Sequence, residues 1–423
     1  MLSAGSRFAS LLGRRLVARD RSARSRSDAR KPSSWQLLKR DLLDTGVSHY
    51  DAALLWATLI LLMTGVVMVY STSISLPEQR GMTHAGPTYF LVRHLSSVAV
   101  AIFAAVIAFA TPVRHWQKAA LPLFAVTLLM LALVFVPVIG KKAGGAYRWL
   151  VSPIGTIQPT EFMKLAVILY VADYAARKQA LMHRFVKGFL PIAVAIGLTG
   201  ALIMAEPDLG ALIVISCTAI GVLFIGGMST RLFFGMGAMM IGIFSLFVLL
   251  VPFRRVRFFS FLEPFAKEYA SGSSYQLTHS LMAIAKGEWI GSGLGAGLAK
   301  LKYLPEPHTD FMFATVGEEL GVVGMIAIVF LFFWIVRRCF EIGRQAISFD
   351  LLFNGLVAQG VGLWIGIQSF INLGVNLGLL PTKGLTLPLM SWGGSAILMT
   401  CVSLAIVLRI DAENRRLMRG TVL

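Results

Sequence analysis

One carboxylate stands where a long polar stretch of the sequence meets a long apolar one. It belongs to Asp310, which follows Pro307, His308 and Thr309 and precedes an apolar run that begins at residue 312. An ionisable side chain at a membrane edge is costly unless it lines a wet cavity, so Asp310 is a candidate functional residue. The alternative is structural, because an aspartate just before an apolar helix also caps the free N–H groups of its first turn.

Basic side chains gather in the polar stretches around residues 140–159 and 253–310. Arg and Lys match phosphate and pyrophosphate groups electrostatically, so we favour an anionic ligand as the reason for this charge. Attraction to anionic lipid headgroups is the alternative. The basic residues are Lys141, Lys142, Arg148, Arg254, Arg255, Arg257, Lys267, Lys286, Lys300 and Lys302.

Other ionisable and polar groups lie inside apolar runs. Glu161 and Lys164 are three residues apart, so on a helix they share a face and can pair. Whether this pair is structural or lines a cavity stays open at this point. Polar groups in so many apolar runs indicate a polar central cavity. The further examples are Glu318, Glu319, Asn372 and Asn376.

A strongly apolar chain carries these residues. Its 423 residues are 56% hydrophobic and 14% charged, whereas soluble domains carry about 25% charged residues. Most of the apolar runs reach the roughly 17–25 residues that span a bilayer as a helix. We therefore expect an all-α polytopic membrane protein with ten transmembrane helices. The runs are 52–72, 91–111, 119–139, 160–176, 188–204, 210–227, 232–252, 312–336, 351–378 and 386–409.

The distribution of charge predicts the topology and the domains. Residues 1–50 form a basic tail that we place in the cytoplasm. Much of the net charge of +18 lies in this tail, which argues against reading the charge as a nucleic-acid-binding surface. Residues 51–411 form the ten-span domain, and residues 412–423 form a cytoplasmic C-terminal tail. The large polar loop, about 253–311, then lies outside between helices 7 and 8, which is the periplasm in a bacterium.

Two segments of the large loop have patterns of their own. Tyr275–Ala285 has apolar residues at helical spacing, which predicts an amphipathic helix lying on the membrane. The glycines at alternate positions from Gly291 to Gly297 predict a mobile linker. The sequence has no metal-ligand cluster and no phosphate-binding loop, and its three cysteines lack CxxC spacing.

Several long motifs in this order resemble the SEDS proteins (shape, elongation, division and sporulation), over residues 50 to about 413. Within that family, the run from Leu380 to Pro388 and the extended N-terminal tail are most similar to the branch that acts in cell division. Two residues depart from the family pattern: Trp392 stands where Tyr is usual, and Glu206 where Gln is usual. The motifs are Tyr147–Trp149, Gln158–Lys164, Glu206–Gly210, Tyr275–Leu277, Pro307–Phe311, Glu318–Gly321 and Leu380–Ser395.

The resemblance implies a peptidoglycan glycosyltransferase that polymerises lipid II at the outer face of the bacterial inner membrane, at the division septum. Asp310 matches the essential aspartate of the family and would be the general base that accepts a proton from the attacking hydroxyl. Attack opposite to the pyrophosphate would turn an α-linked donor into a β-1,4 glycan. A divalent cation, Mg or Mn, could assist, although the sequence shows no site for one. The residues expected at the substrate are Arg148, Lys383, Arg254, Arg255, Glu161, Lys164, His308 and Thr309.

The resemblance also implies a class B penicillin-binding protein, a single-span transpeptidase, as partner, together with other membrane proteins of the division machinery. Two other functions remain open. A polar cavity through ten spans would suit a lipid II flippase, with Glu161 and Lys164 lining the path. A non-catalytic scaffold that recruits a cell-wall synthase is the third possibility. The position of Asp310 at the membrane edge, rather than in mid-bilayer, favours the enzyme.

Overall fold

The computed structural model describes residues 50–74, 86–143, 146–152, 155–182, 185–250, 252–266, 272, 274–301 and 303–420. The predicted N-terminal tail therefore lies outside the described residues, apart from Tyr50. Residues 48–423 form one compact unit.

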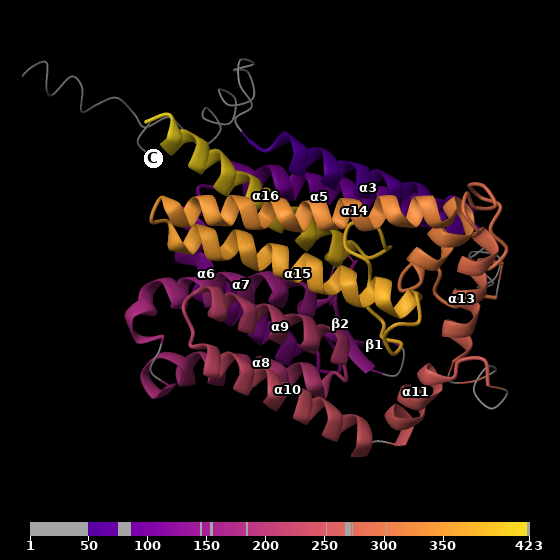
Figure 1. Ribbon diagram of the computed structural model, residues 1–423, viewed down its shortest axis with the longest axis horizontal. Helices are drawn as coiled ribbons and strands as arrows, with labels where there is room; N and C mark the ends of the chain where they lie inside the picture. Colours follow the sequence, from indigo (N-terminus) through magenta and orange to yellow (C-terminus); the bar gives the residue numbers. More distant parts are fainter. Residues whose placement is uncertain are drawn as a thin grey trace, which may run out of the picture. The chain divides into compact units, whose positions relative to one another are not determined.

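Long helices lying side by side make up this unit, as Figure 1 shows. The prediction of a helical membrane protein is confirmed, since six described helices (α3, α5, α6, α14, α15 and α16) are long and apolar enough to cross a bilayer. Helices α8 and α9 and part of α10 are apolar but shorter, so the count of ten spans stays a prediction. The helices are α3 (Ala52–Ser73), α5 (Tyr89–Ala110), α6 (Val113–Leu133), α7 (Pro159–Lys178), α8 (Leu190–Ala205), α9 (Leu209–Ile225), α10 (Thr230–Leu250), α11 (Pro252–Leu262), α13 (Tyr275–Gly287), α14 (Met312–Ser348), α15 (Leu352–Asn376) and α16 (Gly394–Met418), with the short turns η1 (Gln179–Leu181) and η2 (Phe185–Phe189).

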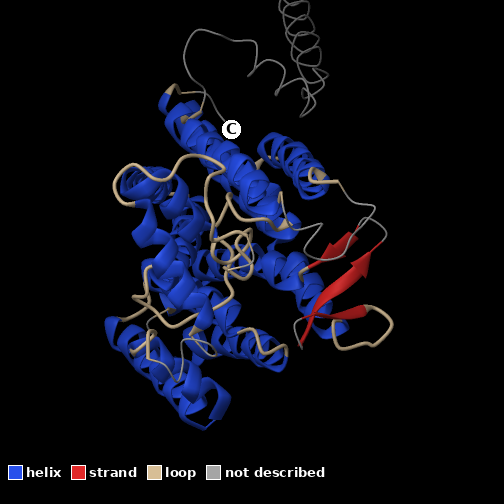
Figure 2. Cartoon of the chain, turned by 90° about the vertical axis from the view of Figure 1, so that its right-hand side faces the viewer, coloured by secondary structure: helices blue, strands red, loops and turns tan. Residues whose placement is uncertain are grey.

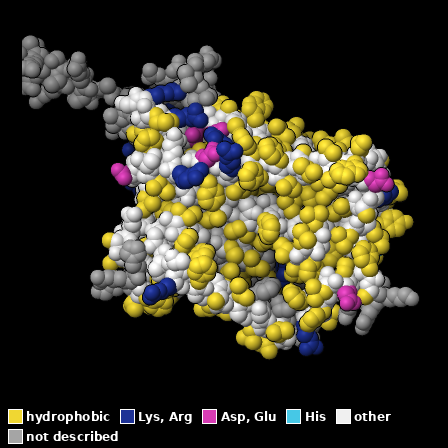
Figure 3. All heavy atoms as spheres, in the orientation of Figure 1, with side chains coloured by type: hydrophobic (Ala, Val, Ile, Leu, Met, Phe, Trp, Pro, Cys, Tyr) yellow, Lys and Arg dark blue, Asp and Glu magenta, His cyan; other side chains and the backbone are white. Residues whose placement is uncertain are grey.

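The surface and the core agree with a membrane setting. On the face drawn in Figure 3, apolar side chains cover most of the middle, and most charged side chains lie toward the two ends. Helices α15 and α16 are the most fully buried of the six spans. Gly343 of α14 and Gly355 of α15 allow close packing, because a Cβ on either would lie within 3 Å of the other's carbonyl oxygen. Small residues commonly permit such close approach in membranes.

A three-stranded antiparallel sheet follows α6, and the sequence did not predict it. It consists of β1 (Gly140–Ala143), β2 (Ala146–Ser152) and β3 (Gly155–Ile157), with β2 in the middle. Figure 2 shows the sheet at one side of the helices. Helix α6 ends at Leu133, six residues before the predicted end, because residues 134–139 turn into β1.

The segment between α15 and α16 is the second difference from the predicted elements. The last apolar run was expected to be helical from residue 386, but α16 begins at Gly394. Residues 379–389 have no helical structure, and Ser391 and Trp392 bond to the loop before α14. We call residues 377–393 the strap. Figure 2 shows loops crossing the middle of the bundle at the end that faces the viewer.

At its other end, α16 continues to Met418, so part of the predicted C-terminal tail is helical. Arg409 and Glu413 form a buried ion pair at 2.9 Å. The Glu413 carboxylate also accepts a hydrogen bond from the backbone N–H of Val113 at 3.1 Å. These contacts fix residues beyond 411 to the first turn of α6.

Candidate active site

Two amides of α15 fix the backbone of Asp310. The side-chain N–H groups of Asn372 and Asn376 both donate to the Asp310 carbonyl oxygen at 3.0 Å. Asn376 also accepts a hydrogen bond from the N–H of Ala314 at 3.0 Å, which ties the first turn of α14 to the same helix. Both asparagines are buried. The two polar residues that the sequence placed inside a span therefore position the candidate base.

The strap holds the two residues before Asp310. The N–H of Trp392 donates to the His308 carbonyl at 2.8 Å, and the hydroxyl of Ser391 donates to the Thr309 carbonyl at 2.5 Å. The His308 ring is buried and packs near the rings of Phe90 and Trp392. His308 and Thr309 therefore shape the loop, and their expected contact with substrate stays a prediction.

The carboxyl of Asp310 faces the strap and has a perturbed pKa. A Cβ at Gly384 would lie 2.9 Å from Asp310 Oδ2, so glycine leaves the space that this carboxyl occupies. Burial, with smaller contributions from the charges of Glu306 and Asp208, raises the pKa of Asp310 to about 7 against the opposing charge of Arg148. A carboxyl that titrates near neutral pH is suited to accept and release a proton.

Arg148 reaches the site from β2. Its Nε donates to the Glu206 carbonyl at 3.0 Å and its Nη2 to the Pro207 carbonyl at 2.6 Å, which braces the turn between α8 and α9. Asp208 in this turn caps α9 by accepting from the N–H of Ala211 at 3.1 Å. The structure therefore brings Arg148 and the 206–208 turn into electrostatic reach of Asp310.

The Glu206 side chain adds a second perturbed carboxyl to this turn. It is fully buried, and neither oxygen has a hydrogen-bond partner in the described part of the chain. Burial, with a smaller contribution from the charge of Asp208, raises its pKa to about 8 against the opposing charge of Arg148. The sequence placed Glu206 in a family motif and marked it as a departure from the usual glutamine, but did not predict its burial.

Glu161 and Lys164 of α7 are connected to the strap through a chain of hydrogen bonds. Their charged groups are 2.6 Å apart and both side chains are buried, so the pairing expected from their spacing is confirmed. Lys164 also donates to Gln368 at 2.9 Å, and Gln368 donates to the carbonyl of Thr386 in the strap at 2.8 Å. This chain of bonds connects the pair to the strap, and contact with substrate stays a prediction.

The other predicted cations are placed differently. Lys383 is half-buried in the strap beside Gly384. Arg255 is exposed on α11, and the side chain of Arg254 lies outside the described part. Two basic residues that we had attributed to an anionic ligand have structural roles: Lys286 pairs with Glu318 at 3.1 Å, and Lys300 pairs with Glu319 at 2.7 Å.

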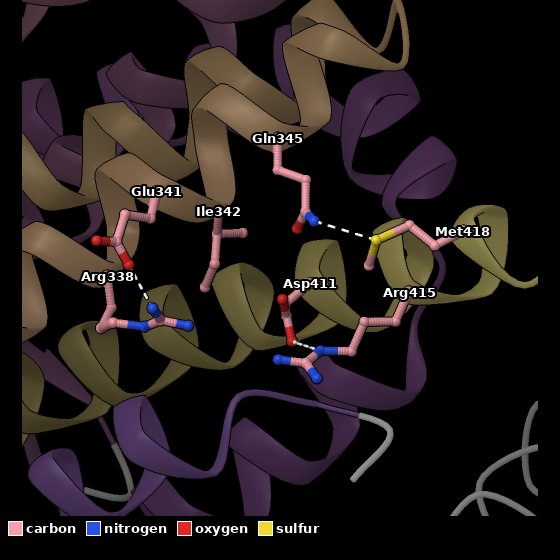
Figure 4. A pocket seen from close by; sticks show the side chains of 7 residues that line it. All are labelled: Arg338, Glu341, Ile342, Gln345, Asp411, Arg415 and Met418. Atoms are coloured by element: carbon pink, nitrogen blue, oxygen red, sulfur yellow. Dashed lines mark hydrogen bonds and ion pairs between the residues drawn. The ribbon is translucent and has the colours of Figure 1, made fainter. Parts of the chain in front are cut away.

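The described residues contain no group of three His, Cys, Asp or Glu side chains that could hold a metal ion. A groove does occur at the other end of the bundle, as Figure 4 shows. It lies about 40 Å from Asp310 along α14 at 1.5 Å per residue. Its charged groups pair with one another, Arg338 with Glu341 and Arg415 with Asp411. The groove is lined by Arg338, Glu341, Ile342, Gln345, Asp411, Arg415 and Met418.

Known proteins share both the sequence and the fold. The chain is 55% identical over 371 residues to a protein of Burkholderia thailandensis named probable peptidoglycan glycosyltransferase FtsW, covering 88% of this chain and 80% of the relative. A protein of the same name from Neisseria gonorrhoeae is 40% identical, covering 91% and 89%.

Two solved structures have a similar fold. One belongs to a peptidoglycan synthase complex that coordinates polymerization and crosslinking, with a TM-score of 0.66 at 26% identity, covering 86% of this chain and 98% of that one. The other is the rod shape determining protein RodA of Thermus thermophilus, with a TM-score of 0.63 at 26% identity, covering 87% and 97%. Residues 52–416 match the Cell cycle protein family of FtsW, RodA and SpoVE. The chain therefore belongs to this family, the SEDS proteins, and is most like its FtsW members.

Proposed function

We propose that the protein is a peptidoglycan glycosyltransferase that polymerises lipid II, with Asp310 as its general base. The names of its FtsW relatives and the similarity to a peptidoglycan synthase support the enzyme class. One observation carries the role of Asp310. Its carboxyl has a pKa near 7 and lies in a loop whose backbone is fixed by Asn372, Asn376 and the strap.

In this mechanism the Asp310 carboxylate takes the proton from the 4-hydroxyl of an incoming lipid II. That oxygen attacks the anomeric carbon of the growing glycan, and the bond to the undecaprenyl pyrophosphate breaks on the opposite face. The configuration inverts from α to β, and no covalent enzyme intermediate forms. A positioned base of this kind contributes about 10²–10⁴-fold in rate.

The leaving pyrophosphate needs positive charge or hydrogen-bond donors as it departs. Arg148 is the first candidate, because two of its N–H donors bind the 206–208 turn and a guanidinium has five. Lys383 is the second, because it lies in the strap next to Gly384, which faces the Asp310 carboxyl. Arg254 and Arg255 on α11 are weaker candidates, since no described contact joins Arg255 to Asp310.

The setting of the reaction is part of the proposal. The apolar helices make the chain an integral membrane protein, and we place Asp310 at the outer face of the inner membrane at the division septum. A class B penicillin-binding protein is the proposed partner, supported by the similarity to a synthase complex that couples polymerization to crosslinking.

Polymerisation of labelled lipid II by the purified chain, with its cognate transpeptidase, tests this proposal. Wild type should give glycan ladders and Asp310→Asn should give none. Asp350→Asn is a matched control, because Asp350 is an exposed aspartate that follows the far end of α14. Ladders from Asp310→Asn would refute the general base. No ladders from any folded variant, with lipid II movement across liposomes, would favour the flippase, and no activity of either kind would favour the scaffold.

A further inference from the structure

Helix α14 is broken at Gly321, and another part of the chain repairs the break. Gly321 has φ 66° and ψ −168°, which no helical residue adopts. In an unbroken helix, the N–H groups of Val322 and Val323 would donate to the carbonyls of Glu318 and Glu319. They donate instead to the carbonyls of Glu288 and Trp289, at 3.0 and 3.2 Å.

The same segment satisfies the two carbonyls that the break leaves open. The N–H of Ser292 donates to the Glu318 carbonyl at 2.9 Å, and the N–H of Gly293 donates to the Glu319 carbonyl at 3.1 Å. Residues 288–293, which we call the insert, therefore replace both lost helical hydrogen bonds. Figure 1 shows the chain that follows α13 lying against the right-hand end of α14.

Two glycines permit this contact. A Cβ at Gly291 would lie 2.2 Å from the Glu319 carbonyl oxygen, and a Cβ at Gly321 would lie 2.5 Å from the Gly291 nitrogen. Gly291 also has a φ of +85°, which disfavours other residues. The glycine run that we predicted to be a mobile linker is thus fixed to α14 by backbone contacts.

The side chains of Glu318 and Glu319 fix the residues that follow the insert. Glu318 accepts from the N–H groups of Leu298 and Ala299 at 2.8 and 3.1 Å. Glu319 accepts from the N–H of Gly295 at 3.0 Å and pairs with Lys300. The loop before Asp310 is therefore joined to α14 from Glu318 to Val323.

The length of α14 gives the depth of the insert. At the far end, the Arg337 guanidinium lies 5.3 Å from the Trp334 ring centre and pairs with Glu341, a combination typical of a membrane interface. At 1.5 Å per residue, Gly321 lies about 24 Å from Arg337 along the helix. The hydrocarbon core of a bilayer is about 30 Å thick. The break and the insert thus lie at hydrocarbon depth, where every backbone polar group must be bonded internally.

Two neighbouring side chains of the insert are large, apolar and strongly exposed, and they lie in the sequence between the exposed polar residues Glu288 and Ser292. Trp289 is 72% exposed and Ile290 is 84% exposed, and on α14 Val323 and Ile326 are also exposed, at 62% and 61%. This surface is continuous with the span, because Val323 bonds to Trp289. We propose that the insert is embedded in the leaflet on the Asp310 side of the membrane, where Trp289 and Ile290 contact lipid acyl chains.

Spin labelling of the full chain in liposomes tests this proposal. Ile290→Cys carries a nitroxide, whose accessibility is measured toward oxygen, which enters lipid, and toward a water-soluble nickel chelate. Ile326→Cys on α14 is the lipid-facing reference, and Lys141→Cys on the exposed sheet is the aqueous reference. The parent chain, with Cys217, Cys339 and Cys401, is labelled in parallel to give the background.

The label at Ile290 should match the one at Ile326, with high oxygen access and nickel access severalfold below that at Lys141. Nickel access equal to that at Lys141 would overturn the proposal. Low access to both reagents would also overturn it, since a protein surface would then cover the insert. If Ile290→Cys fails to fold, brominated lipids should quench wild-type fluorescence more strongly than that of Trp289→Phe, and equal quenching would contradict lipid contact.

Discussion

Three carboxylates lie within ten residues at the start of α14, and they are used in two different ways. Glu318 and Glu319 are buried and fully engaged, with lysines and backbone N–H groups as partners. Asp310 accepts no side-chain hydrogen bond from any described residue, and its pKa is raised to about 7. Paired carboxylates build the loop, whereas the carboxyl left without donors stays free to exchange a proton.

The two ends of α14 show the same contrast. At the far end, Arg338 pairs with Asp51 and Glu341, so opposite charges are matched. At the near end, Glu206 is fully buried and Asp310 is half-buried, and the charge of Arg148 only partly offsets the effects that raise their pKa values. Carboxyl groups with raised pKa values are typical of functional sites, whereas a matched counter-charge would bring the pKa of such a group back toward its ordinary value.

The largest expected effect comes from removing the exchangeable proton site. Asp310→Asn should reduce polymerisation at least about 100-fold, because the general base is lost. The unfolding temperature should not fall, since a carboxyl that accepts no hydrogen bond from a described residue loses none on becoming an amide. Parallel measurement of glycan synthesis and thermal unfolding checks both parts. A large fall in stability would mean that Asp310 is structural, like Glu319.

Glu319→Gln should have the opposite profile. Removing one partner of a buried ion pair costs about 3–5 kcal/mol, because Lys300 is left buried without its counter-charge. Thermal unfolding in detergent should show a large fall in the unfolding temperature. Glu341→Gln, at a partly exposed pair, is the control and should change little. Unaltered stability of Glu319→Gln would remove the distinction between the two kinds of carboxylate.

Gly384→Ala should impair the reaction with little loss of stability. The new methyl group would lie 2.9 Å from Asp310 Oδ2, so the carboxyl must move while the backbone stays in place. We expect about a tenfold fall in polymerisation, because small displacements of reacting groups are costly. Gly393→Ala is a suitable control in the same strap, since its methyl would meet only ordinary contacts. Equal activities of the two variants would show that the carboxyl is not confined.

Glu206→Gln should have the smallest effect on polymerisation, and it should stabilise the fold. The pKa of Glu206 is raised to about 8, so the folded state prefers the neutral carboxyl while the unfolded chain ionises near its ordinary value of 4.5. The stability that neutral Glu206 contributes is complete below pH 4.5 and declines as pH rises toward 8. Glutamine does not titrate, so the variant's advantage should grow over that range, by on the order of 1 kcal/mol per unit of pKa shift at most.

Unfolding temperatures at about pH 5, 6.5 and 8 would show this trend, and Asp350→Asn gives the baseline for an exposed carboxylate. An advantage that is constant with pH would mean that Glu206 is ionised in the folded protein and paired with a donor.

The lengths of the hydrophobic runs predicted the long apolar helices, because a membrane span can be recognised from its own sequence without any tertiary contact. The Glu161–Lys164 pair was predictable from its spacing, and its contact is confirmed. The exchange of hydrogen bonds between the insert and α14 was not predictable. Gly291 and Gly321 are thirty residues apart in the sequence, and each alone suggests only backbone flexibility. Nor could sequence spacing show that Lys286 and Lys300 neutralise Glu318 and Glu319.

The strap shows why the predicted last helix began too early. Residues 386–393 are mostly apolar, but the N–H of Trp392 and the hydroxyl of Ser391 bond to the loop that carries Asp310, and tertiary bonds of this kind override local propensity. Asn372 and Asn376 carried a signal, because two amides one turn apart in a span need partners. Only the structure shows that these two amides donate to the backbone carbonyl of Asp310.

The dependence of polymerisation rate on pH, measured with saturating lipid II from about pH 5.5 to 8.5, tests the central claim most directly. With Asp310 as general base, the wild-type rate should rise with pH about tenfold per unit below the pKa near 7 and then level off. The residual rate of Asp310→Asn should lack this step. A wild-type rate that is unchanged across pH 7, or a step retained in Asp310→Asn, would contradict the assignment of Asp310 as the base.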